Sequence, residues 1–410
     1  MRETTDDTPD WWGAGLFARQ PADAPWAQGG HRVTYGRLRT EVAGLRRLFL
    51  AHGIRPGSTV ALRGTPSFSQ VWSVFALWSL GAQVMLMGPW MRGRELGRLL
   101  DAARPQFHVT FGAVGPAPDV FHDECEILVR RLRGGQPAVT DHCLVQFTSG
   151  STGFAKAIGR DAPSLLVELD AFSRIGGMSQ RGSRVLVLGS LAHSFNLIGG
   201  LLHNMNVGAM TVFPRSTALP AVLRAGIRSG VDAVLGTTEH FSRLAQGSRP
   251  LRMPALRRAI AGGERLDPRV YTAFSERHGV RIGQAYGTTE TGIIAADPTG
   301  WFGPDAVGMI APGLRVRLVG GELQVRLERS PYVELTTAPE ELFQAEHEGE
   351  AGWLRTRDHA RFDPDTGALR LTRRIDPLVD RGPLTRGRDR ALLADRTLGR
   401  ILTRSGRVLS

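Results

Sequence analysis

The chain has 410 residues, of which 42% are hydrophobic and 22% charged, with 50 glycines and 24 prolines. This composition is typical of a globular protein with two or three packed units, and it excludes a fibre or a disordered tail protein. The first residues lack the order of a secretory signal, and apolar stretches such as 71–87 are interrupted by polar residues and fall short of a membrane span. Only Cys125 and Cys143 are present, so we expect neither a disulfide framework nor a cysteine-based metal site, and we predict a cytoplasmic protein.

The formal net charge of +12 raises the hypothesis of a nucleic-acid or acidic-membrane partner. Basic residues are spread along the chain, however, and 50 of the 51 are arginine, which favours a compositional bias over a binding device. We therefore expect no nucleic-acid partner, and a basic scaffold remains an alternative that rests on charge alone. The single lysine, Lys156, is more informative, because chemistry of this chain that needs a lysine ammonium group must use it.

Strand and helix signals alternate along much of the chain. The series begins with strands predicted at 33–35, 59–62 and 81–86 and helices predicted at 38–48 and 70–80. Beyond residue 160 it continues with helices at 165–174, 198–205 and 219–229 and strands at 185–189, 210–213 and 233–235. Such alternation is typical of βαβ units with mostly parallel sheets.

From residue 303 the pattern changes to short strands separated by turn residues, predicted at 308–319, 322–327, 354–356 and 368–372. We therefore expect an α/β fold. Its parts would be two sheet-and-helix subdomains at about 1–150 and 151–300, a small β-rich, barrel-like subdomain at about 301–376, and an arginine-rich tail at 377–410 with at most one helix.

The segment 146–156, QFTSGSTGFAK, has the composition of a phosphate-binding loop. Gly150 and Gly153 allow the backbone to approach an anion closely, and Lys156 adds a positive charge. Hydroxyl donors are supplied by Thr148, Ser149, Ser151 and Thr152. A serine- and glycine-rich surface loop is the alternative interpretation.

The loop is not that of a P-loop ATPase, because Ala155 and Ala157 stand where that pattern needs glycine and serine or threonine. It resembles instead the phosphate loop of the adenylate-forming (AMP-binding) superfamily, which comprises acyl- and aryl-CoA synthetases, adenylation domains of non-ribosomal peptide synthetases, and luciferases. The pattern of that family is roughly T-S-G-[ST]-T-G-x-P-K-G. This chain departs from it at the same two alanines.

Four further segments resemble motifs of this family, in the family's order. AGGERL at 261–266 resembles the G-G-x-x-L turn that lies along adenine, and QAYGTTE at 284–290 resembles the Y-G-x-T-E motif. LRTRDHARF resembles the T-G-D segment, with Arg357 in place of glycine. Residues 373–376 resemble the G-R-x-D hinge, with Arg373 in place of glycine. The resemblance covers about residues 1–376 and implies ATP-dependent activation of a carboxylic acid.

The resemblance also implies a role for each matching residue. Tyr286 would stack on adenine, Thr289 would contact the α-phosphate, and Glu290 would hold Mg²⁺. Asp358 would bind the ribose hydroxyls and Arg374 the ribose or phosphates, at a hinge whose pivot is Asp376. The expected nucleotide-binding residues are Thr148, Ser149, Gly150, Ser151, Thr152, Gly153, Gly262, Gly263, Glu264, Gln284, Tyr286, Gly287, Thr288, Asp358 and Arg374, and the expected catalytic residues are Lys156, Thr289, Glu290 and His193.

These residue types suit the implied reaction. Attack of a carboxylate on the α-phosphate crowds negative charge, so it needs hydroxyl and amide donors, a cation of the chain and a divalent metal. The glycine-rich loop would supply the hydroxyl and amide donors, Lys156 the cation, and Glu290 a ligand for the divalent metal. Taken singly, Glu290 and Asp358 would more often be solvated surface carboxylates, but five motifs in the family's order favour the functional interpretation.

The segment 191–200, LAHSFNLIGG, resembles the helix entry that closes the acid pocket in this family. His193 and Phe195 would border the acid there, and Asn196 could meet a phenolic or carboxylate group. The apolar residues behind them favour an apolar acyl or aryl acid, and no aspartate is present here for the ammonium group of an amino acid. A partly buried helix cap with a satisfied histidine is the alternative.

Members of the family continue past the hinge with a small mobile domain that carries a catalytic lysine. Residues 377–410 contain no lysine, and Arg400 in RTLGRILTR matches the lysine context only weakly, so we expect that domain to be largely missing. The chain would either pass the acyl-adenylate on itself or rely on a separate protein for the missing domain. The expected cofactors are ATP and Mg²⁺, with CoA or the phosphopantetheine of a carrier protein as acyl acceptor, in secondary-metabolite or lipid pathways. The alternative is a catalytically silent relative that binds nucleotide or acyl-adenylate and regulates a partner.

Overall fold

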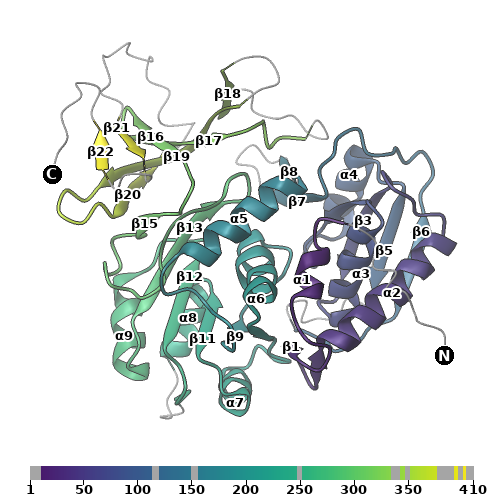
Figure 1. Cartoon of the computed structure of the whole chain (residues 1–410), viewed down its shortest axis with the longest axis horizontal. Coiled ribbons are helices and arrows are strands. Elements are labelled where there is room, and N and C mark those ends of the chain that lie inside the picture. The colour runs from purple at the N-terminus through teal and green to yellow at the C-terminus, as the bar shows by residue number, and fades with distance from the viewer. Residues whose placement is uncertain are drawn as a thin grey trace.

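A computed structural model describes residues 11–112, 120–148, 156–246, 252–333, 342–346 and 351–375, and the backbone of 392–395 and 400–402. Within these residues the strands form three sheets, two of them covered by helices (Figure 1). The expected α/β fold, with two sheet-and-helix units and a β-rich third, is confirmed. No helix in the described part of the chain is long and apolar enough to cross a membrane.

The first described sheet has the order β6-β5-β3-β4-β7-β8. Its strands are β3 (Thr59–Gly64), β4 (Gln83–Leu86), β5 (Phe107–Phe111), β6 (Ile127–Arg131), β7 (Leu144–Thr148) and β8 (Lys156–Arg160), and its helices are α1 (Ala14–Ala18), α2 (Tyr35–Ala51), α3 (Phe68–Ser79) and α4 (Gly93–Ala103). The side chains of Thr34 and Ser67 cap α2 and α3 by accepting from backbone N–H groups, which fixes where these helices begin. Every residue of α3 is buried, including the polar Ser69, Gln70 and Ser73, so this helix lies inside the core.

The second sheet has the order β15-β14-β13-β12-β11-β9-β10-β1-β2 among the described residues. Its strands are β1 (Pro25–Gln28), β2 (Arg32–Thr34), β9 (Arg184–Val187), β10 (Met210–Val212), β11 (Ala233–Gly236), β12 (Arg258–Gly262), β13 (Ile282–Thr288), β14 (Gly292–Asp297) and β15 (Met309–Ile310). Its helices are α5 (Ala162–Arg174), the π-helix η1 (Phe195–Leu202), α6 (His203–Val207), α7 (Leu219–Ser229), α8 (Thr238–Ala245) and α9 (Pro268–His278). Helices α5 and α6 lie on the side that faces the first unit (Figure 1), and their buried residues share a core with α1 and α3.

The strands group differently from the expected boundary at residue 150 in two places. Strand β1 pairs in parallel with β10, so the β1–β2 hairpin belongs to the second sheet, whereas β8 completes the first. Local periodicity identifies a strand but does not specify its partner, since pairing depends on long-range packing.

One helix also differs from the sequence expectation at 198–205. The segment begins earlier, at Phe195, and runs as a π-helix before it becomes the α-helix α6. Gly199 lies against the ring of Phe172 and Gly200 against Val187, so the wide helix packs closely on α5 and β9.

The third sheet has the order β18-β19-β17-β16-β21-β22 in the described segments, with β20 beside β19. Its strands are β16 (Val316–Val319), β17 (Glu322–Leu327), β18 (Phe343–Ala345), β19 (Gly352–Phe362), β20 (Leu369–Arg374), β21 (Leu392–Asp395) and β22 (Arg400–Leu402).

Three expectations about this part of the chain are corrected. The single strand expected at 308–319 is interrupted near Gly313, whose φ is +88°, so β15 joins the second sheet and β16 the third. The strand expected at 354–356 extends over 352–362 with alternating burial, which is the period of two of a half-buried strand. The segment expected as a tail contributes β21, which pairs with β16.

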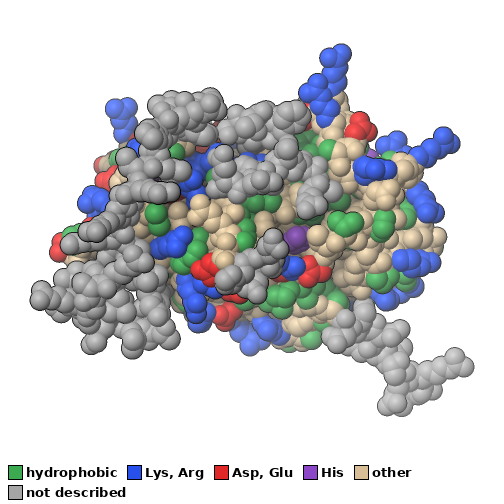
Figure 2. All heavy atoms as spheres, turned by 90° about the horizontal axis from the view of Figure 1, so that it is seen from above, with side chains coloured by type: hydrophobic (Ala, Val, Ile, Leu, Met, Phe, Trp, Pro, Cys, Tyr) green, Lys and Arg blue, Asp and Glu red, His purple; other side chains and the backbone are tan. Residues whose placement is uncertain are grey.

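The positive charge of the chain is dispersed on the face drawn in Figure 2, where basic side chains are scattered over the margin and the interior and acidic side chains lie among them. This distribution gives no single basic patch on the described part of that face.

Candidate functional site

Four of the sequence motifs meet at one cavity of about 330 Å³ between the second and third sheets. Eight of the expected nucleotide-binding residues line it, namely Gly263, Glu264, Gln284, Tyr286, Gly287, Thr288, Asp358 and Arg374. They come from the end of β12, from β13 and from the β19–β20 hairpin. Residues more than a hundred positions apart in the chain therefore form one concave surface, as in a typical ligand site.

Asp358 is the centre of the polar contacts in this cavity. The Tyr286 hydroxyl donates to its Oδ2 at 2.6 Å, and Arg374 Nη1 donates to Oδ1 at 2.9 Å and to Oδ2 at 2.8 Å. The cross-strand register of β19 and β20 places Arg374 directly opposite Asp358. Burial and the neighbouring carboxylate raise the pKa of Tyr286, so its phenol stays protonated and donates.

The glycine turn after β12 connects this cavity to the segment expected to bind the acid. Gly263 has a φ of +89° and nothing stands within 4 Å of where its Cβ would lie, so the turn is open to the cavity. A Cβ on Gly262 would lie 2.8 Å from the ring of Phe195. Phe195 is therefore in direct contact with the turn.

Gln284 supports the cavity wall. Its amide nitrogen donates to the carbonyl of Ala306 at 2.7 Å and to that of Pro304 at 3.1 Å. The side chain thereby holds the 303–306 loop at the edge of the cavity, which is a use that the motif alone did not indicate.

The turn between β13 and β14 carries the two residues expected at the phosphates. The hydroxyls of Thr288 and Thr291 lie 3.1 Å apart, and the Thr291 N–H donates to Thr288 Oγ1 at 3.2 Å. These contacts close the turn, and Thr289 and Glu290 occupy its tip. Glu290 lines a second cavity of about 570 Å³, so the turn stands between two hollows.

Lys156 reaches this region from the first sheet, where it opens β8 opposite Thr148 of β7. Its half-burial lowers the pKa of the Lys156 ammonium group; the carboxylate of Glu290 opposes this shift, and the guanidinium groups of Arg357 and Arg374 add to it. These charges come from all three sheets. Five of the expected loop residues, Ser149, Gly150, Ser151, Thr152 and Gly153, lie outside the described residues.

Ala157, which departs from the family pattern, is almost fully buried. It belongs to an apolar cluster with Met85, Val145 and Val333. The methyl group that stands where the family pattern has glycine therefore fills part of the core.

The expected acid-binding segment holds an exposed histidine. The ring of His193 stacks on that of Trp90, with centroids 4.8 Å apart and planes 17° apart. Ser194 donates to Gln146 Oε1 at 2.6 Å, and Gln146 Nε2 donates to the Ala192 carbonyl at 2.8 Å, which ties this segment to β7.

Asn196 is buried and hydrogen-bonded to the backbone. Its amide nitrogen donates to the backbone carbonyls of Leu188 at 3.2 Å and Ser190 at 3.0 Å. The protein thus uses this group to hold the segment that follows β9.

A magnesium site would depend on Glu290. In the described residues, no three histidine, cysteine, aspartate or glutamate side chains are grouped to hold a metal ion. Mg²⁺ typically keeps several waters and is bound by one or two carboxylates together with substrate phosphates. The single carboxylate of Glu290 would fit that requirement together with the phosphates of a bound nucleotide.

Sequence reasoning missed several residues of this region. Trp90 follows β4 in a segment without periodicity, so nothing in the sequence indicated its contact with His193. Glu168 did leave a signal, because it is an acidic residue on the buried face of α5, beside Leu165 and Leu169. Arg160 and Gly292, its two neighbours, were not singled out either.

Comparison with known proteins agrees with this geometry. Residues 16–329 match the family described as AMP-binding enzyme. The chain belongs to this family. The resemblance to adenylate-forming enzymes is thereby confirmed, and so is the expectation of a ligase-type enzyme.

Two curated relatives of this AMP-binding chain are CoA ligases. A 4-chlorobenzoate–CoA ligase of Arthrobacter sp. is 24% identical over 399 residues, covering 87% of this chain and 73% of the relative. An anthranilate–CoA ligase of Pseudomonas aeruginosa is 28% identical over 249 residues, covering 58% of this chain and 47% of the relative. The N-terminal domain of FACL13 from Mycobacterium tuberculosis has the same fold, with a TM-score of 0.72, 17% identity and coverage of 89% of this chain and 100% of that structure.

Proposed function

We propose that this AMP-binding enzyme holds ATP with its adenosine in the 330 Å³ cavity and converts an apolar acyl or aryl acid into an acyl-adenylate. The meeting of Tyr286, Asp358 and Arg374 beside the turn of Thr289 and Glu290 carries the proposal. The Asp358 carboxylate can accept further hydrogen bonds from ribose hydroxyls, since its two oxygens offer about four acceptor positions. Gly263 would let the adenine ring lie flat on the turn.

In the proposed reaction a carboxylate oxygen of the acid attacks the α-phosphorus. The bond from that phosphorus to the oxygen bridging to the β-phosphate breaks, and its electron pair leaves with pyrophosphate. Lys156 and the Thr289 hydroxyl would neutralise charge that grows on the phosphate oxygens, where preorganised donors are most effective. Mg²⁺ held by Glu290 would act as a Lewis acid on the phosphates.

Aromatic side chains support an aryl or apolar acid. Phe195 contacts the glycine turn, and the stacked pair of Trp90 and His193 stands at the same segment. Two relatives are described as ligases of 4-chlorobenzoate and anthranilate, which are aryl acids. We propose His193 and Phe195 as residues that border the acid, and CoA or a carrier-protein thiol as the acceptor.

The decisive experiment measures acid-dependent pyrophosphate release with Mg²⁺-ATP and hydroxylamine as a trap, over a panel of aryl, fatty and amino acids. Lys156→Ala and Glu290→Ala are each expected to lower the rate about 10²–10³-fold, as loss of one preorganised charge-stabilising group does. Parallel reactions with CoA in place of hydroxylamine test the acceptor.

Glu276→Ala, on the exposed face of α9, is the matched control for Glu290→Ala and should keep the wild-type rate. Absence of pyrophosphate release for every acid, with ATP binding intact, would reject the adenylating activity and leave a nucleotide-binding relative. A rate unchanged in Glu290→Ala would reject the assigned site.

A further inference from the structure

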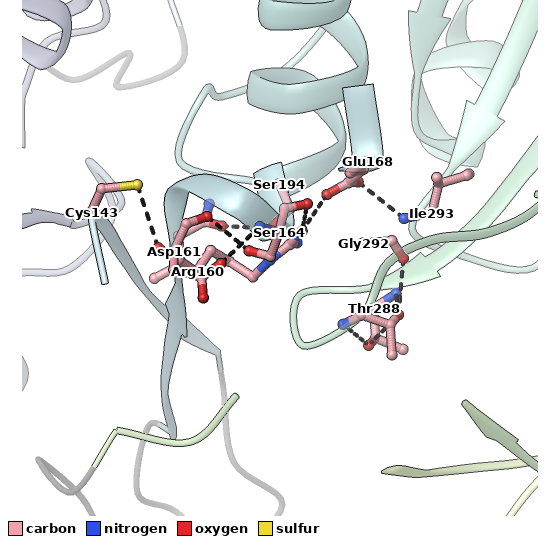
Figure 3. A network of polar contacts seen from close by, with 11 residues as sticks. Cys143, Arg160, Asp161, Ser164, Glu168, Ser194, Thr288, Gly292 and Ile293 are labelled. Atoms are coloured by element: carbon pink, nitrogen blue, oxygen red, sulfur yellow. Dashed lines mark hydrogen bonds and ion pairs between the residues drawn. The ribbon is translucent and has the colours of Figure 1, made fainter. Parts of the chain in front are cut away.

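Glu168 is an acidic residue inside the molecule for which the proposed reaction has no use. Its side chain is only 6% exposed, on the buried face of α5. An ionised carboxylate at such depth is strongly unfavourable unless it is paired and hydrogen-bonded. Glu168 has both kinds of partner, because Arg160 Nη2 donates to its Oε2 at 2.8 Å and the Ile293 backbone N–H donates to its Oε1 at 3.0 Å (Figure 3).

The backbone of the β13–β14 hairpin approaches the Glu168 carboxylate so closely that only a glycine fits there. Gly292, the first residue of β14, has a φ of +70°, in the region that favours glycine. A Cβ placed on it would overlap the carboxyl group of Glu168. The contact therefore fixes where the hairpin leaves its turn.

From Gly292 a chain of hydrogen bonds continues into the turn that bears Thr289 and Glu290. Thr291 Oγ1 donates to the Gly292 carbonyl at 2.9 Å, and the Thr291 N–H donates to Thr288 Oγ1 at 3.2 Å. Both ends of the turn are thus connected to the point that Glu168 holds (Figure 3).

The second partner of Glu168, Arg160, connects it to the strand that carries Lys156. Arg160 is the last residue of β8, the strand that Lys156 opens, and its guanidinium group is held by Ser164 through the hydroxyl and the carbonyl, each at 3.1 Å. The Arg160 side chain is 5% exposed, so this ion pair is largely shielded from solvent. It ties the strand of Lys156 to the hairpin of Glu290.

We propose that Glu168 is a positioning residue that sets Glu290 relative to Lys156, so that Mg²⁺ and the phosphates of ATP are bound together in one arrangement. This inference rests on the proposed roles of Glu290 and Lys156. It assigns no contact with substrate to Glu168, which acts through Ile293, Gly292 and the turn.

The test is equilibrium binding of ATP to the full chain, with Mg²⁺ and with EDTA, beside thermal unfolding of each variant. Glu168→Ala and Gly292→Ala should reduce the gain in ATP affinity that Mg²⁺ confers by about tenfold or more, the lower end of the effect of groups that orient a metal ligand. ATP affinity in EDTA should change little. Glu168→Gln should keep part of the gain, because its amide oxygen still accepts from the Ile293 N–H.

Asp170→Asn on the same helix is the matched control, since Asp170 forms an exposed ion pair with Arg174, and it should bind as the wild type does. If Glu168→Ala fails to fold, Glu168→Gln and Gly292→Ala decide. The inference is overturned if Mg²⁺ increases the ATP affinity of the folded variants as much as that of the wild type, even where the melting temperature falls. It is also overturned if Mg²⁺ does not increase the ATP affinity of the wild type. Because binding needs no turnover, the outcome stands apart from the pyrophosphate assay that tests the proposed function.

Discussion

At the scale of single residues, the cavity is organised around a carboxylate whose acceptor positions are partly occupied by hydrogen bonds from the protein. Asp358 receives hydrogen bonds from Tyr286 and Arg374, which hold it in one orientation. Both oxygens of the carboxylate are thereby directed by protein donors. In the proposed function these three side chains form a preorganised acceptor for ribose hydroxyls.

Replacement of this carboxylate should weaken ATP binding specifically. In Asp358→Asn the charge that holds Arg374 is lost and one acceptor becomes a donor, so we expect the KM for ATP to rise about 5- to 150-fold, corresponding to about 1–3 kcal/mol. Steady-state pyrophosphate release at varied ATP measures it. Asp363→Asn, a carboxylate at the turn of the same hairpin, serves as control. Equal KM values in the two variants would show that Asp358 does not contact the nucleotide.

At the scale of elements, strand β19 turns the Asp358 side chain inward and holds the neighbouring Arg357 in a strained backbone conformation. Alternating burial along β19 turns Thr356, Asp358 and Ala360 inward. Arg357, which lies between Thr356 and Asp358, has a φ of +60°, at a position where the family pattern has glycine. A non-glycine residue in this left-handed conformation costs about 1–2 kcal/mol. The chain retains a guanidinium group here whose charge acts on Lys156.

Arg357→Gly should therefore separate stability from nucleotide binding. Relief of the left-handed strain should raise the free energy of unfolding by about 1 kcal/mol, and the greater freedom of glycine in the unfolded chain offsets part of this gain. The KM for ATP should also rise, because a cation near the proposed phosphate position is removed. Urea unfolding and ATP kinetics measure the two effects.

The matched control is Arg104→Gly at the end of α4, where φ is +43° and the residue lies outside the nucleotide cavity. It should leave the KM for ATP unchanged, although loss of its hydrogen bonds to the Gly134 carbonyl will offset part of the gain in stability. A higher KM in both variants would refute the electrostatic role of Arg357.

At the scale of the whole molecule, two of the buried histidines have strongly lowered pKa values. Burial lowers the pKa of His203 to about 4, and burial with the charges of Arg130 and Arg63 lowers the pKa of His108 to about 4. Both side chains are nearly inaccessible to solvent. Between pH 6.5 and 4 the unfolded chain binds protons at these positions and the folded chain does not.

Stability should consequently fall as the pH falls through this window. Each histidine contributes a loss of about 1.4 kcal/mol per pH unit between about pH 6.5 and 4, and the effect levels off below the folded pKa. Urea unfolding of the wild type and of His203→Leu at pH 7, 6 and 5 measures it, and the variant should show the shallower dependence. His52→Gln, at an exposed position, should keep the wild-type slope, and a parallel dependence for His203→Leu would contradict the assignment.

Much of the fold and of the site follows from local sequence. The strands at 59–62 and 233–235 and the helices at 165–174 and 219–229 were predicted nearly at their observed positions, because short apolar runs between turn residues and apolar residues at helical spacing are local signals. The motif residues Tyr286, Asp358 and Arg374 were identified in the same way, since each lies in a short pattern.

Only the tertiary structure decided which segments meet. The sheet that receives β1, the division of 308–319 between two sheets and the stacking of Trp90 on His193 depend on contacts between distant residues, which no local period encodes. The same holds for Glu168. Its sequence shows an acidic residue on an apolar helix face, but its partners, Arg160 and the backbone of Ile293, were supplied by packing, because a buried carboxylate must find its charge and its hydrogen bonds wherever the fold places them.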